Sequence, residues 1–162
     1  MPMGKTAMKC LRYLIAASAL AFTLPAQAGT LDPEVIIYRG SGILDSGGTS
    51  FVGYATAFMC TPFSGVSENI RFVVRGNDGA IKANQAIVVA HLNTVTASTK
   101  QVDALTSQIN LVTGSVLQGT VAIAATSTSV TCTAMMLSAT TTPTIAAMLH
   151  MTRFNPLSAT EE

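Results

Sequence analysis

Two short stretches, Phe58-Met59-Cys60-Thr61 and Thr131-Cys132-Thr133, decide the fold of this chain. Each cysteine lies among apolar and β-branched residues, which favour a strand. The third cysteine, Cys10, lies in an N-terminal leader, so only Cys60 and Cys132 remain once the leader is removed. In an oxidising compartment two cysteines can form one intramolecular disulfide. We therefore predict a Cys60–Cys132 bridge that joins the two sheets of a small β-sandwich.

A pair of free thiols or a zinc site is the alternative use of these cysteines. Zinc sites in proteins usually contain a C-x-x-C pair or nearby histidines, and the sequence has neither close to Cys60 or Cys132. The sequence therefore favours the bridge.

Residues 1–28 have the organisation of a secretory signal peptide. A basic start precedes an apolar segment, residues 14–22, that is too short to span a bilayer comfortably. Ala26-Gln27-Ala28 then forms a typical cleavage site, and an uncleaved membrane anchor is the alternative. We predict an exported protein, periplasmic or extracellular, whose residues 29–162 form a single β-sandwich domain with no membrane span after cleavage.

Charged residues make up only 10% of the chain, whereas about a quarter is usual in soluble domains. The leader holds Lys5, Lys9 and Arg12 but no acidic residue, so the processed chain is slightly acidic. This charge balance excludes a general electrostatic attraction to nucleic acid or anionic lipid. Thr, Ser, Ala and Gly stand where charges are usually found, and such a surface protects sheet edges poorly against self-association.

The rest of the chain predicts about eight short strands and no helix. The clearest is 68–75, in which Ile70, Phe72 and Val74 face one way and the residues between them the other. Gly76-Asn77-Asp78-Gly79 then predicts a hairpin turn, because these residues tolerate a positive φ. The other strands are predicted at 35–39, 51–60, 80–92, 94–99, 120–126, 129–137 and 144–154, with a weak signal between 101 and 118. This pattern predicts an all-β, antiparallel sandwich of about seven to nine strands.

Two features favour an immunoglobulin-like topology for this sandwich. In such domains an inter-sheet bridge packs against a large aromatic residue from the next strand, and Phe72 follows Cys60 at a suitable distance. The match is partial, since Phe replaces the usual Trp and Val130 stands where a tyrosine corner would place Tyr. The face of strand 51–60 that carries Cys60 and Phe58 is predicted to face the core.

Three stretches resemble a loose group of small, uncharacterised, exported bacterial proteins. They are Phe58-Met59-Cys60-Thr61-Pro62-Phe63-Ser64, residues 124–135 and Met151-Thr152-Arg153-Phe154-Asn155-Pro156. The resemblance covers most of the processed domain, and it implies an immunoglobulin-like β-sandwich without implying any activity.

Ile43-Leu44-Asp45-Ser46-Gly47 resembles the aspartic-protease motif of two apolar residues followed by Asp-Ser/Thr-Gly. That chemistry needs two aspartates that share one proton, so one copy per chain would require a symmetric dimer. The alternative is that Asp45 begins a simple turn. A trypsin-like role for Ser46 is disfavoured because His91 and His150 both follow it in the sequence. No catalytic residue is assigned.

Thioether and imidazole side chains near the C-terminus could form a soft site for Cu(I). The candidates are Met135, Met136, Met148 and His150. Methionine also fills irregular gaps in cores without binding any ligand. No metal or cofactor is therefore assigned, and these residues are kept as copper candidates only.

The sequence favours a non-enzymatic structural or adhesive protein. Its unguarded sheet edges would contact a protein partner or a second copy of the chain by strand addition. A dimeric aspartic protease centred on Asp45 and a periplasmic Cu(I)-binding module are the alternatives. Arg71 and Arg75 share one strand face and could grip an anionic group or simply solvate the outside of a sheet.

Overall fold

The structure is a computed structural model that describes residues 34–48, 50–140, 142 and 144–154. The predicted leader, residues 1–28, and the polar C-terminal tail, residues 155–162, lie outside the described residues. Within the described part, no helix has the length and apolar character needed to cross a membrane.

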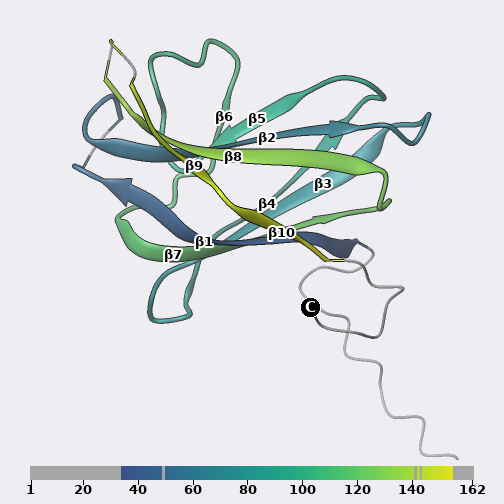
Figure 1. The fold of residues 1–162 in the computed structure, drawn as a ribbon, viewed down its shortest axis with the longest axis horizontal. Coiled ribbons are helices and arrows are strands. Elements are labelled where there is room, and N and C mark those ends of the chain that lie inside the picture. Colours follow the sequence, from purple (N-terminus) through teal and green to yellow (C-terminus); the bar gives the residue numbers. More distant parts are fainter. Residues whose placement is uncertain (1–33, 49, 141, 143, 155–162) are drawn as a thin grey trace, which may run out of the picture.

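Strands dominate the fold and form one curled, mixed sheet (Figure 1). The strands are β1 (Val35–Ser46), β2 (Tyr54–Pro62), β3 (Glu68–Arg75), β4 (Ile81–Val89), β5 (Val95–Ser98), β6 (Ile109–Asn110), β7 (Val116–Ala125), β8 (Val130–Ser138), β9 (Ile145–Leu149) and β10 (Met151–Arg153). The predicted all-β class is confirmed.

The sheet folds over itself into a half-barrel with two layers. One layer contains β4, β3, β7, β1 and β10, and the other contains β5, β2, β8 and β9. β1 pairs with β7 along most of its length, but at its end Asp45 pairs with Ala55 of β2 and so connects the layers. β4 and β6 are the two ends of the path of paired strands, and the half-barrel is open between them.

One pair of strands departs from the predicted antiparallel arrangement. β5 and β6 run parallel, with Ala97 opposite Ile109. A parallel pair needs a crossover connection, and residues 99–108 provide it. This crossover covers the outside of the second layer, where Val102 packs with Ala55 and Ala57. The prediction of an antiparallel-only sheet is wrong at this place, because the polar crossover carries no strand or helix periodicity.

The predicted strand that spans 144–154 is divided at His150. Its first half, β9, pairs with β8 in one layer, and its second half, β10, pairs with β1 in the other. A single extended segment therefore links both layers on the closed side of the half-barrel. β1 is longer than predicted: Gly40 pairs in register with Val121 of β7, and a register shift between Ser41 and Ile43 accommodates Gly42 within the strand.

The Cys60–Cys132 disulfide is present, but it does not join two sheets. Cys60 on β2 and Cys132 on β8 lie directly opposite each other on neighbouring antiparallel strands, with their Cα atoms 4.2 Å apart. Such a short separation is typical of a non-hydrogen-bonded pair within one sheet. The prediction of an inter-sheet bridge is therefore wrong. The alternation of large and small residues in the sequence predicts that both cysteines face inward. It does not indicate that the strands of the two cysteines are neighbours in the sheet.

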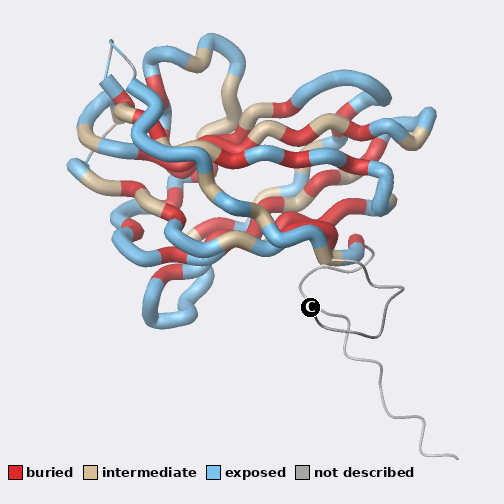
Figure 2. Tube along the Cα trace, in the orientation of Figure 1, coloured by how far each residue is buried: buried red, intermediate tan, exposed pale blue. Residues whose placement is uncertain are grey.

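The core lies between the two layers (Figure 2). The Phe58 and Phe72 rings pack there with their centroids 5.9 Å apart, so Phe72 reaches the core as predicted. On β2 the predicted inward residues Thr56, Phe58 and Cys60 are buried, while Tyr54 is 46% exposed at the strand's start. Without an inter-sheet bridge, the immunoglobulin-like topology loses its main support.

Candidate functional site

Asp45, the candidate protease residue, lies at the end of β1 in a buried polar cluster. Lys100 Nζ is 3.0 Å from Asp45 Oδ1, and Thr113 Oγ1 donates a hydrogen bond of 2.8 Å to Asp45 Oδ2. The side chains of Lys100 and Asp45 are only 6% and 4% exposed. Both carboxylate oxygens are thus engaged by residues of the same chain. The geometry favours a structural role for Asp45 over a role as one half of a dimeric protease.

Lys100, like Thr113, is a residue of this cluster that the sequence did not single out. Its ammonium donates hydrogen bonds to the backbone carbonyls of Ser46 and Val52, the latter at 3.0 Å. These contacts connect the crossover after β5 to the turn between β1 and β2. The Asp-Ser-Gly-Gly segment is therefore the end of β1 followed by the start of a turn, and a buried ion pair holds it.

The copper candidates do not converge on one point. Met135 of β8 lies opposite Met148 of β9, so these two thioethers share the outer face of their layer. Met136 lies opposite Thr56, which faces the core, and it is therefore on the other side of the same layer. His150 is the unpaired residue between β9 and β10. Among the described residues, no group of three or more His, Cys, Asp or Glu side chains could hold a metal ion.

His91 lies in a turn after β4 rather than in the predicted strand. Its Nδ1 accepts a hydrogen bond of 3.1 Å from the backbone nitrogen of Gly65. This contact ties the turn after β4 to the turn after β2. His91 therefore contacts a neighbouring turn in this structure.

The free edge of β4 is the strongest candidate for a functional surface. Among the described strands β4 pairs only with β3, so one side of its nine-residue backbone has no partner strand. Lys82 is its one charged residue, and this side chain pairs with Asp78 at 3.5 Å. Val88 near the other end of β4 is 74% exposed. Natural proteins usually protect a long edge strand with charges, proline or a cover, and β4 has little of this protection.

A small cavity of about 240 Å³ lies where the half-barrel is open. Ile87 and Val89 of β4 form one side of it, and Val95 of β5 and Ile109 of β6 form the other. Ile87 and Ile109 are only partly buried, although they pack against the main core. The backbone edge of β4 that has no partner strand among the described residues thus borders a cavity in which apolar residues of the core approach solvent.

No protein-family model, curated protein or solved structure matches this chain.

Proposed function

We propose that this chain is an exported, non-enzymatic interaction protein that binds a second copy of itself through β4. The observation that carries the proposal is the free, nearly uncharged edge of β4 beside the open side of the half-barrel. Pairing of two edge strands satisfies backbone N–H and C=O groups that otherwise face water, and the side chains of alternate residues determine which strands fit.

A two-fold axis gives this contact a definite register, because closed homodimers are usually symmetric. If two copies of β4 pair antiparallel about Gln85, Lys82 of one copy lies opposite Val88 of the other. Val88 lies on the exposed face of β4, and Lys82, which lies where the register with β3 shifts, is partly exposed. The resulting sheet continues from one copy into the next and covers the Ile87 side of the cavity in both.

A charge introduced at Val88 tests this register. Val88→Lys places two cations opposite each other and is expected to weaken the dimer, whereas Val88→Glu places an anion opposite Lys82 and is expected to strengthen it. The matched control is Val112→Lys, because Val112 is 73% exposed in the loop before β7 and lies outside β4. Light scattering after size-exclusion chromatography, across a series of protein concentrations, measures the dimer fraction.

A protein that stays monomeric at every concentration would contradict self-association through β4. A dimer that responds equally to Val88→Lys and Val112→Lys would place the interface elsewhere on the molecule. If the monomer instead binds a strand of a different envelope protein along β4, the partner of this edge is not a second copy of the chain, and the proposed homodimer is wrong.

Export is part of the proposal. The leader-like residues 1–28 and the Cys60–Cys132 bridge support an oxidising compartment, periplasmic or extracellular. An immunoglobulin-like relationship stays a prediction, with the packing of Phe72 on Phe58 as its remaining support.

A further inference from the structure

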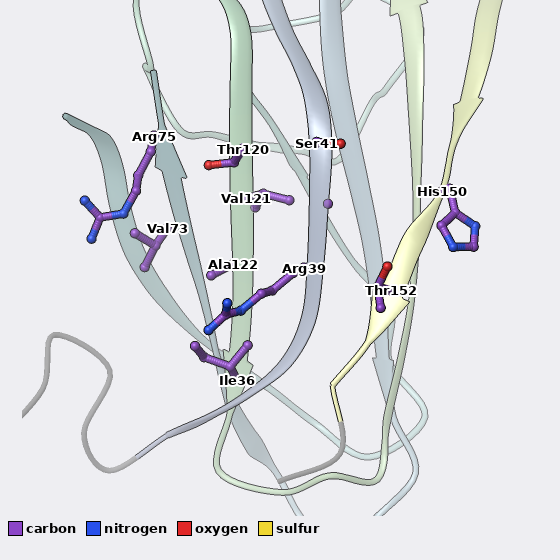
Figure 3. A pocket seen from close by; sticks show the side chains of 11 residues that line it. Ile36, Arg39, Ser41, Val73, Arg75, Thr120, Val121, Ala122, His150 and Thr152 are labelled. Carbon is purple, nitrogen blue, oxygen red and sulfur yellow. The ribbon is translucent and has the colours of Figure 1, made fainter. Parts of the chain in front are cut away.

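A second candidate site lies on the outer face of the layer that contains β3, β7 and β1 (Figure 3). It is an open groove of about 770 Å³ that crosses β3, β7, β1 and the segment around β10. Its lining contains small and hydroxyl-bearing residues, including Gly40, Ser41, Thr120 and Ala122, and the apolar side chains of Ile36, Val73 and Val121. Arg75 rises from β3 at one end and Arg39 from β1 nearer the middle, as the labelled side chains show.

Arg39 and Arg75 are cations without a carboxylate partner among the described residues. Arg71, Lys82 and Lys100 each form an ion pair with an acidic side chain, but neither groove arginine does. The groove lining that the structure describes contains no Asp or Glu. The groove is therefore locally positive, although the processed chain as a whole is slightly acidic.

Each groove arginine is held in place by a contact that leaves most of its donors free. The Arg39 guanidinium lies over the Phe154 ring, 5.1 Å from the ring centroid. Arg75 Nη1 donates a hydrogen bond of 2.8 Å to the Gly79 carbonyl. A guanidinium has five N–H donors, so both groups keep several for an anionic ligand. Such charge-assisted bonds, often bidentate, are the strong polar contacts at protein surfaces.

The spacing of the two arginines selects an extended ligand. Arg75 lies opposite Thr120 of β7, which lies opposite Ser41 of β1, and Arg39 is two residues further along β1. Two strand spacings across and two residues along the sheet separate their Cα atoms by roughly 12 Å. The two guanidinium groups are anchored by different contacts, Arg39 at the Phe154 ring and Arg75 at the Gly79 carbonyl, which favours a separate anionic group of the ligand for each arginine. A chain with repeated negative groups can contact both arginines, and the Ser41 and Thr120 hydroxyls offer it further hydrogen bonds.

We propose that this groove binds an acidic polysaccharide through its carboxylates. Among the described residues, none of the exposed large apolar side chains lines the groove, which disfavours insertion into a membrane. The same lining contains no Phe, Tyr or Trp on which nucleic-acid bases could stack. Hydroxyls, small side chains and two free arginines suit the polar surface of a sugar chain.

The experiment compares binding of polygalacturonate to the wild-type protein and to the double variant Arg39→Gln/Arg75→Gln by calorimetry. We expect binding by the wild type and a loss of at least about tenfold in affinity in the double variant. Arg153→Gln, which removes an exposed cation outside the groove lining, is the matched control and should leave the affinity unchanged. Fully methyl-esterified polygalacturonate should not bind, and added salt should weaken the binding of the charged polymer.

Three results would overturn the proposal. The first is that the wild type fails to bind polygalacturonate. The second is that Arg153→Gln lowers the affinity as much as the double variant does. The third is that the protein binds phosphatidylglycerol vesicles and not the polysaccharide. Unfolding midpoints verify that the variants are folded. If the double variant does not fold, binding of the methyl ester as tightly as the acid by the wild type would also contradict a role for carboxylates.

Discussion

Replacing Lys100 with methionine is expected to destabilise the protein by about 3–5 kcal/mol, because it leaves a buried carboxylate without its partner. The Asp45 and Lys100 side chains are almost fully buried, and the ammonium also binds the carbonyls of Ser46 and Val52. Methionine keeps a similar volume but donates no hydrogen bond. Equilibrium unfolding in urea, followed by far-ultraviolet circular dichroism, measures the loss.

Two further variants separate the buried pair from a general effect of lost charge. Asp45→Leu combined with Lys100→Met removes both charges and should recover part of the stability, since the uncompensated carboxylate is gone. Lys82→Met breaks the exposed pair with Asp78 and should move the unfolding midpoint little. If the single variant Lys100→Met were as stable as the wild type, Lys100 would not be the partner that stabilises the buried Asp45 carboxylate. The hypothesis of a dimeric aspartic protease centred on Asp45 would then have to be considered again.

Removal of the disulfide by Cys60→Ala and Cys132→Ala is expected to lower the free energy of unfolding by roughly 4 kcal/mol in the chain-entropy account. The reason is that the two cysteines are 72 positions apart, so the bridge restricts a long loop of the unfolded chain. Urea unfolding of the double variant and of the oxidised wild type, under the same conditions, measures the difference.

The reduced wild-type protein provides the control for this pair. It should unfold close to the double variant, because both lack the same covalent restriction. A double variant as stable as the oxidised wild type would contradict the bridge as a source of stability. A wild-type protein that carries two free thiols after purification from an oxidising compartment would contradict the bridge itself.

Local patterns in the sequence were sufficient to predict most strands and the inward direction of both cysteines. The alternation around Phe72 and the glycine-rich turn after Arg75 depend on neighbouring residues only, and both are confirmed. Strand neighbours depend on contacts between distant residues. The pairing of β2 with β8, which places Cys60 opposite Cys132, therefore could not be deduced and was predicted wrongly.

The polar cluster at Asp45 shows the same limit. The motif around Asp45 was visible, but its partner Lys100 lies in a Thr- and Ser-rich segment without clear periodicity. Only the crossover between β5 and β6 brings the lysine to the end of β1. Similarly, Arg39 and Arg75 become part of one groove because β7 pairs with both of their strands. No local signal connects these arginines in the sequence.

We propose an exported protein that forms a dimer by pairing the β4 strands of two copies. Native mass spectrometry of the protein purified from a periplasm is the most direct test of this proposal. We predict a chain that begins at Gly29, has lost two hydrogens through the Cys60–Cys132 bridge, and forms a dimer that Val88→Lys weakens. A bridged monomer at every concentration, or a dimer that Val88→Lys does not affect, would contradict the account.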